Sequence, residues 1–305
     1  MAFDERYRQQ MQLLFQLLPI VAREKDFALK GGTAINLFEL DMPRLSVDLD
    51  LAYLGMEARD EALDRCRKIM ERLAGEIERR IPQSRVERRL HDRDEIRVIV
   101  KMGPIMVKME SSPVARGAVG PVIVREAQPR VQDQFGYAAI QCISSSELFG
   151  GKFCAALDRQ HPRDLFDVLQ LMERDGVTRE IFDGFLVALM SSNRPMAEIL
   201  EPNRKDFSEL FRGEFQGMAE LPVSLESLEQ AREELIHSIH RFMTADDRAF
   251  LLDFKRGAPD WNQFAYPEAQ NLPAILWKQL NLDRMNPDKR QVAIERLDSV
   301  LARMV

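Results

Sequence analysis

Cysteine and histidine are both scarce in this chain of 305 residues, which contains three of the first and four of the second. The cysteines lie far apart and form no C-x-x-C pair, so the sequence gives no sign of a zinc ribbon or a dithiol redox centre. The histidines offer at most one pair on a common helix face, without a third ligand nearby. We therefore expect buried thiols and no site for a transition metal.

Long hydrophobic runs are also missing. The apolar stretch from Leu13 to Ala22 is interrupted by Gln16 and Pro19 and is too short to cross a bilayer. It follows acidic residues, whereas a secretory signal has a basic lead. We interpret it as one face of a helix, and we expect a cytoplasmic protein with no membrane partner.

The chain lacks an excess of positive charge, since its formal net charge is −6. This argues against nucleic acid wrapped over the whole surface. The segment from Arg79 to Lys108 is different, with nine basic residues against four acidic ones. It could bind a polyanion such as RNA, or it could be the solvated face of two strands. The arginines that we select as RNA-binding candidates are Arg79, Arg80, Arg88 and Arg89.

The spacing of apolar residues predicts an α+β fold in two domains. Helical and alternating patterns are mixed in the first half, whereas almost only helical patterns follow Ser144. We predict a mixed-sheet domain over residues 1–143 and an all-helical domain over residues 144–305. Ser144 and Glu147 have the spacing of a capping box, which would begin the first helix of the second domain. Within the first domain, "SRVERRL" and "IRVIVKM" flank the polar "HDRDE" and predict a hairpin.

A glycine pair stands between a predicted strand, Phe27–Lys30, and a predicted helix, Ala34–Leu40. Gly31, Gly32 and Thr33 would leave backbone N–H groups pointing outward where a phosphate could bind. Glycine also allows a triphosphate to approach the backbone closely. The same pair could instead form an ordinary turn.

Two aspartates follow in "VDLDL", within a strand predicted from Leu45 to Tyr53. The period of a strand places Asp48 and Asp50 on one face and their apolar neighbours on the other. Paired carboxylates repel each other unless a cation neutralises them, and Mg²⁺ prefers such hard oxygen ligands. The alternative is an exposed strand face.

A third carboxylate, Glu110, shares a predicted strand face with Lys108 in "IMVKMES". It could complete a two-metal site with the aspartates, or it could accept the proton of an attacking hydroxyl. It could also be a solvent-facing strand residue without a chemical role.

A fourth group of charged residues lies between Ser146 and Leu171. Lys152 and Arg159 are seven residues apart and share a helix face, and Asp164 and Asp167 follow on the next predicted helix. A cation here could stabilise the charge that develops on a triphosphate. The alternative is a salt-bridge network between two helices, for instance one that pairs Arg159 with Asp164.

Four motifs, "LKGGTAINL", "RLSVDLDL", "VKME" and "KFCAALDRQHPRDLFDV", occur in this order. This arrangement resembles the AbiEii-type nucleotidyltransferase toxins of bacterial type IV toxin–antitoxin and abortive-infection systems. These toxins are similar to the MenT toxins and belong to the DNA polymerase β-like nucleotidyltransferase superfamily. The superfamily often has Gly-Ser where this chain has Gly32-Thr33, although threonine keeps the hydroxyl.

The resemblance implies a polymerase β-like nucleotidyltransferase core, followed by a helical C-terminal domain, and it implies roles for individual residues. Those implied to bind nucleotide are Gly31, Gly32, Thr33, Arg44, Ser46, Lys152, Arg159 and Asp164. Those implied to be catalytic are Asp48, Asp50, Glu110, Lys152 and Asp167, with Asp48, Asp50 and Glu110 also as metal ligands.

The expected activity is transfer of a nucleoside monophosphate from an NTP to RNA, in particular the 3′ end of tRNA, with two Mg²⁺ ions. As a toxin, the protein would be neutralised by a cognate, AbiEi-like antitoxin encoded alongside it. One alternative is nucleotidyl transfer to a small molecule or a protein. Another is a catalytically silent, NTP-binding regulator.

Overall fold

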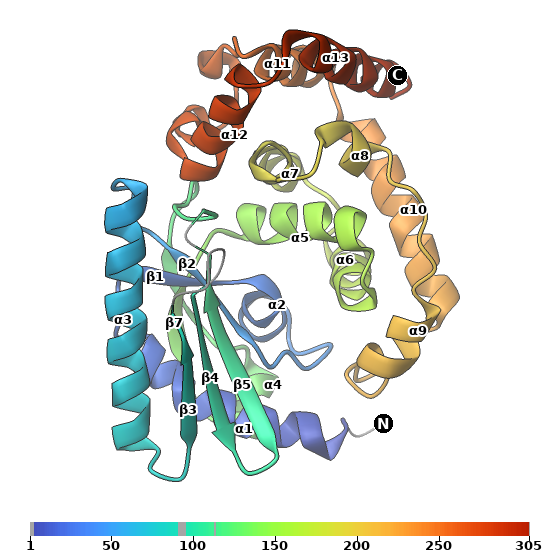
Figure 1. Cartoon of the computed structure of the whole chain (residues 1–305). Helices are drawn as coiled ribbons and strands as arrows, with labels where there is room; N and C mark the ends of the chain where they lie inside the picture. The colour runs from blue at the N-terminus through green and yellow to red at the C-terminus, as the bar shows by residue number, and fades with distance from the viewer. Residues whose placement is uncertain (1–2, 91–95, 113, 305) are drawn as a thin grey trace. The chain divides into compact units, whose positions relative to one another are not determined.

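The computed structural model describes residues 3–90, 96–112 and 114–304, which form two compact units (Figure 1). The first unit comprises Met1–Leu148 and Phe215–Val223, and the second comprises Phe149–Glu214 and Ser224–Val305. Helix α5 (Ser145–Arg159) contributes residues to both. The sheet belongs to the first unit, whereas the described part of the second unit is helical, so the predicted α+β class is confirmed.

The described residues form one mixed sheet of seven strands in the order β3-β4-β5-β2-β1-β7-β6. The strands are β1 (Phe27–Lys30), β2 (Leu49–Tyr53), β3 (Arg85–Arg89), β4 (Ile96–Met102), β5 (Ile105–Ser111), β6 (Ile123–Glu126) and β7 (Ala139–Cys142). Strand β2 at the centre runs antiparallel to β1 and parallel to β5. The predicted hairpin strands are present as the antiparallel pair β3 and β4, and the "HDRDE" segment between them lies outside the described residues.

Helices α1 (Glu5–Val21) and α3 (Arg59–Arg80) cover the same face of this sheet, because each contacts the sheet and they contact each other. The apolar spacing of α3 explains its orientation. Leu63, Met70 and Leu73 recur at helical intervals and are all buried. The short helix α4 (Pro129–Phe135) contacts α1.

The strand predicted from Leu45 to Tyr53 is too long. Strand β2 begins only at Leu49, because the backbone before it bonds elsewhere. The Leu45 N–H donates to the Met218 carbonyl at 2.9 Å, and the Thr33 hydroxyl donates to the Asp48 carbonyl. These partners are remote in sequence, so the alternating pattern could not reveal them.

The helix predicted from Ala34 to Leu40 begins earlier than expected. Helix α2 (Gly31–Ala34) includes both glycines and continues as a π-helix, η1 (Ile35–Glu39). The Asn36 side-chain amide donates to the Gly32 carbonyl at 3.0 Å. The glycines are therefore the first residues of the helix, with a side chain one turn later bonded to their backbone.

The second unit is built on α6 (Pro162–Arg174), α7 (Arg179–Ser191) and α10 (Leu225–Phe242), which pack together. The remaining helices are α8 (Met196–Leu200), α9 (Ser208–Leu210), η2 (Phe211–Phe215), α11 (Ala245–Arg256), η3 (Trp261–Gln263), η4 (Pro267–Asn271), α12 (Pro273–Asp283) and α13 (Pro287–Ala302). Helix α13 packs on α8 and α11, and α12 packs on α7. In the part of the chain that is described, no helix combines the length and the apolar character needed to span a bilayer.

The cysteines are buried free thiols, as predicted. Burial raises the pKa of Cys66 to about 11 and those of Cys142 and Cys154 to about 12. The thiolate is the nucleophile and metal ligand, so these residues act as small apolar side chains.

Helix α6 begins at an imidazole cap. His161 Nδ1 accepts a hydrogen bond from the Arg163 N–H at 3.2 Å, and Nε2 lies 3.2 Å from a Glu214 carboxylate oxygen. Burial, assisted by the neighbouring Arg163 charge, lowers the pKa of His161 below its ordinary 6.5. The cap requires the neutral ring, because a protonated Nδ1 cannot accept.

We predict that His161 makes the protein less stable in mild acid. Because the folded-state pKa is the lower one, the unfolded chain binds more protons, and stability is lost as the pH falls below about 6.5. His161→Asn should keep a capping oxygen and remove this contribution. Urea unfolding between about pH 5 and 8 should show a smaller acid loss for the variant. Identical pH profiles would contradict the prediction.

Candidate functional site

The two glycines at the end of β1 leave room for side chains from the neighbouring chain segment. Gly31 has φ +71°, and a Cβ built there would lie 2.2 Å from Asp50 Oδ2. A Cβ on Gly32 would lie 2.8 Å from Arg44 Nη2 and 2.9 Å from Ser46 Oγ. The turn is thus packed directly against Asp50, one of the predicted catalytic aspartates, and against Arg44 and Ser46, which the resemblance implies to bind nucleotide.

Thr33 connects the glycine turn to the segment that carries the aspartates. Its hydroxyl donates to the Asp48 carbonyl and lies 3.1 Å from Ser46 Oγ, and its side chain is fully buried. Arg44 is also buried, and its Nη1 donates to the Leu45 carbonyl at 3.0 Å. These contacts fix the backbone around the turn.

A row of four charged residues crosses the centre of the sheet. The register aligns Lys30 with Asp50, Asp50 with Glu110, and Glu110 with Arg97. Arg97 Nε lies 2.5 Å from Glu110 Oε1. The carboxylates on β2 and β5 are therefore flanked by Lys30 on β1 and Arg97 on β4. This arrangement reduces the repulsion between the two carboxylates.

Asp48 lies next to this row, with Lys108 Nζ 4.0 Å from its Oδ1. The structure thus brings Gly31, Asp48, Asp50 and Glu110 to one region of the first unit. Sequence reasoning missed Lys30 and Arg97. Their alternation marks them as polar-face residues, but only the cross-strand register shows which carboxylates they face.

The carboxylates suit a divalent cation only in part. Asp48 is about one-third exposed at 33%, and Asp50 is also partly exposed, so both can reach a ligand. Mg²⁺ is commonly held by one or two carboxylates together with substrate phosphates and water. Across residues 3–90, 96–112 and 114–304, however, no three His, Cys, Asp or Glu side chains come together as a metal-binding group. Glu110, the predicted third ligand, is engaged by Arg97.

The predicted cluster after Ser146 forms a buried ion network in the second unit. Lys152 Nζ lies 2.8 Å from Asp164 Oδ1 and 3.0 Å from Asp167 Oδ2. Arg159 Nη2 pairs with Asp164 Oδ2 at 2.8 Å, the ion pair that the alternative interpretation named. These ion pairs join α5 and α6.

The adjacent glycines in α5 have different environments. A Cβ on Gly150 would lie 2.3 Å from the backbone of Gly184 in α7, whereas one on Gly151 would meet no atom within 4 Å. Gly150 therefore permits two helix backbones to approach closely. This contact lies wholly within the second unit.

The basic segment is more neutral than its composition indicated. Arg79 and Arg80 both pair with Glu76, and Arg88 contacts Glu71 and Glu78 at 2.8 Å. These carboxylates come from α3, so the helix partly neutralises strand β3. Arg89 is exposed on that edge strand of the sheet.

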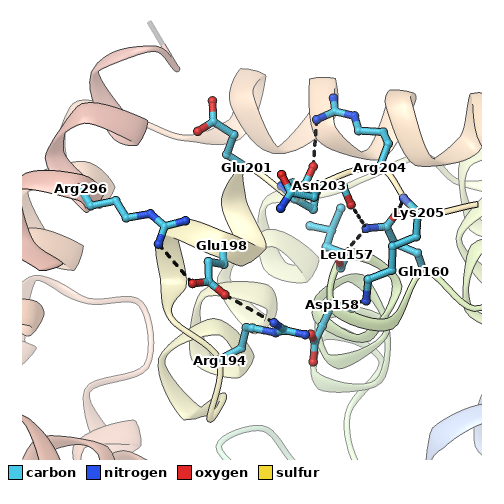
Figure 2. Close-up of a pocket in the computed structure, with 11 residues that line it drawn as sticks. Leu157, Asp158, Gln160, Arg194, Glu198, Glu201, Asn203, Arg204, Lys205 and Arg296 are labelled. Atoms are coloured by element: carbon cyan, nitrogen blue, oxygen red, sulfur yellow. Dashed lines mark hydrogen bonds and ion pairs between the residues drawn. The ribbon is translucent and has the colours of Figure 1, made fainter.

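A pocket of about 480 Å³ lies within the second unit, and several charged residues of its lining are already paired with one another (Figure 2). Arg194 Nε lies 2.6 Å from Asp158 Oδ1, and Glu198 accepts contacts from both Arg194 and Arg296. An anion would have to displace these carboxylates. We therefore place the candidate site at the glycine turn.

The family model described as nucleotidyl transferase AbiEii toxin, type IV toxin–antitoxin system, matches residues 12–275. The chain belongs to the AbiEii family. The resemblance inferred from the four motifs is thereby confirmed, and membership implies a nucleotidyltransferase toxin. No curated protein matches the chain in sequence.

A solved structure supports the fold of this AbiEii protein. MenT4, a nucleotidyltransferase toxin from Mycobacterium tuberculosis, is 15% identical and superposes with a TM-score of 0.57. The match covers 97% of this chain and 93% of MenT4. At this identity the likeness concerns the fold, which agrees with the nucleotidyltransferase fold predicted from the sequence.

We predict that Gly31→Ala destabilises the AbiEii protein and displaces Asp50. The left-handed backbone alone costs an alanine roughly 1–2 kcal/mol, and the new Cβ would overlap the carboxylate. Gly75→Ala is the matched control, because Gly75 lies in α3 with no atom within 4 Å of its Cβ position. The control should stabilise the protein by about 1 kcal/mol. Urea unfolding measures both, and equal stability of the two variants would contradict the packing at Gly31.

We further predict that Lys152→Met destabilises the second unit by about 3–5 kcal/mol, because it leaves two buried carboxylates without their shared cation. Arg159→Met is the control, since the Arg159 side chain is 63% exposed and its loss should cost no more than about 1 kcal/mol. Thermal unfolding of both variants provides the measurement. Similar losses would show that Lys152 is not the centre of the network.

Proposed function

We propose that this AbiEii protein transfers a nucleoside monophosphate from an NTP to an RNA acceptor, specifically the 3′ end of tRNA, in an Mg²⁺-dependent reaction. The observation that carries the proposal is the direct packing of Gly31 against Asp50. Partly exposed glycine backbone at the start of a helix and a carboxylate able to bind a cation thus adjoin each other. Metal-bound NTP requires both features together.

Each part of this region has a proposed task. The partly exposed backbone of Gly31 and Gly32 would bind the triphosphate. Asp48 and Asp50 would hold Mg²⁺ together with oxygens of that triphosphate. When bound, the metal neutralises phosphate charge and lowers the pKa of the attacking hydroxyl. The hydroxyl oxygen forms a bond to the α-phosphorus, the bond to the β-phosphate oxygen breaks, and pyrophosphate leaves.

Glu110 has the most constrained role in the proposal. A second Mg²⁺ would need its carboxylate, which the Arg97 guanidinium holds. Ligation would therefore require exchange of that ion pair for a metal. If the pair is retained, Glu110 remains beside Asp50 as an acceptor for the proton of the hydroxyl.

The second unit supplies the remaining proposed residues. Lys152 forms ion pairs with Asp164 and Asp167. A direct contact of Lys152 or Arg159 with nucleotide stays a prediction. For the acceptor, Arg89 is the preferred RNA contact, while Arg79, Arg80 and Arg88 would have to exchange carboxylates for phosphates. The proposed protein partner is a cognate, AbiEi-like antitoxin.

The deciding experiment incubates the protein with Mg²⁺, total tRNA and each α-labelled NTP in turn. We expect label on RNA with one preferred NTP, and a loss of about 100-fold or more in Asp48→Ala. Asp64→Ala is the control, because Asp64 is an exposed carboxylate on α3 in the same unit. This control should retain wild-type transfer.

The other outcomes distinguish the alternatives. If label moves to a small molecule or to protein and this transfer depends on Asp48, the proposed nucleotidyl transfer would stand and the RNA acceptor would be wrong. NTP binding without any Asp48-dependent transfer would favour a silent regulator. Equal activity of Asp48→Ala and Asp64→Ala would remove the carboxylate site from the reaction.

A further inference from the structure

A short segment from the second half of the chain belongs to the first unit. We call this segment, Phe215–Val223, the strap; the chain leaves the second unit after Glu214 and re-enters it at Ser224. Phe215 and Met218 anchor the strap, since each is 2% exposed. The strap has no regular apolar pattern, so its return to the first unit could not be predicted from the sequence.

The strap bonds to the loop that follows η1. The Leu45 N–H donates to the Met218 carbonyl at 2.9 Å, and the Glu220 N–H donates to the Pro43 carbonyl at 3.0 Å. Between them, Arg44 and Ala219 form an isolated antiparallel bridge. The loop thereby acquires strand-like pairing without belonging to the sheet.

Further contacts hold the strap in register. The Asp4 N–H donates to the Gly217 carbonyl at 3.3 Å, and Glu220 pairs with Arg130. Arg130 also binds Asp41 through its backbone N–H at 3.1 Å. The strap is therefore held on both sides of the Arg44–Ala219 bridge, at Gly217 and at Glu220.

This pairing determines where the residues beneath the glycine turn lie. Arg44 Nη2 is 2.8 Å from the Cβ position of Gly32, and Ser46 Oγ is 2.9 Å from it. A loop without the strap would have to order these side chains each time nucleotide bound, and that entropy would be subtracted from the affinity.

We infer that the strap is a positioning element that sets the affinity for NTP by fixing Arg44 and Ser46 under the glycine turn. This inference rests on the proposed function. The strap has no part in the chemical step, so its loosening should weaken NTP binding and leave kcat at saturating NTP near the wild-type value.

Two substitutions at one position test the inference. Glu220→Pro removes the N–H that bonds to Pro43, whereas Glu220→Ala keeps this N–H and removes only the ion pair with Arg130. We expect the proline variant to bind Mg²⁺-NTP about ten-fold more weakly in equilibrium titrations with ATP, GTP, CTP and UTP. The alanine variant should remain close to wild type.

Hydrogen exchange provides a measurement that does not depend on nucleotide. The Leu45 amide should exchange faster in Glu220→Pro than in Glu220→Ala, because its acceptor lies on the strap. Should the proline variant not fold, Gly217→Ala replaces it, since Gly217 has φ +83° and an alanine there would strain the strap.

The outcomes separate this inference from the proposed function. Faster Leu45 exchange with unchanged NTP affinity would overturn the positioning role, and unchanged exchange would overturn the fastening itself. A fall in kcat with unchanged affinity would also contradict it. If the wild-type protein bound none of the four NTPs, the proposed function would fail and the strap's effect on affinity with it, while the exchange data would still report on the loop.

Discussion

The missing side chain at Gly31 is the constraint on which the candidate site depends. Asp50 Oδ2 lies 2.2 Å from the place where a Cβ would be, so the carboxylate can adjoin the turn only because the residue is glycine. The left-handed backbone at Gly31 begins helix α2 directly after the last pairing of β1, Lys30 with Asp50. Turn geometry and carboxylate position are therefore one feature, and the buried contacts of Thr33 hold both in place.

The basic residues around the aspartates limit the electrostatic free energy that a bound metal ion or triphosphate can gain. Each of the three carboxylates has a basic residue beside it. Lys30 is aligned with Asp50, Arg97 is aligned with Glu110, and Lys108 lies near Asp48. A metal-bound triphosphate carries both signs of charge. Its metal ion can pair with the carboxylates, and its phosphates can pair with the basic residues. The cost of breaking such pairs stays modest at partly exposed positions. Hence the row can be stable alone and still accept a ligand.

The sequence predicted the local features of the site and missed the non-local ones. A period of two placed Asp48 and Asp50 on one face, and four motifs in order predicted the family and the α+β fold. The start of β2 was misplaced because Leu45 pairs with Met218, far along the chain. Arg97 was missed for the same reason, since its meeting with Glu110 depends on strand register. Local periodicity carries no information about either partner.

Exposure distinguishes the two charge clusters of this AbiEii protein. The side chains of Lys152 and Asp167 are 8% and 0% exposed, and their charges stabilise each other. A ligand that separated them would incur the free-energy cost of breaking a buried ion pair. Asp48 and Glu110 keep 33% and 23% of their side-chain surface. Of these two clusters, the one on the sheet has the more accessible carboxylates, and they lie next to the partly exposed glycine turn. Residues that looked equivalent as motif members therefore divide by burial into an ion network between two helices and a partly exposed group of carboxylates on the sheet.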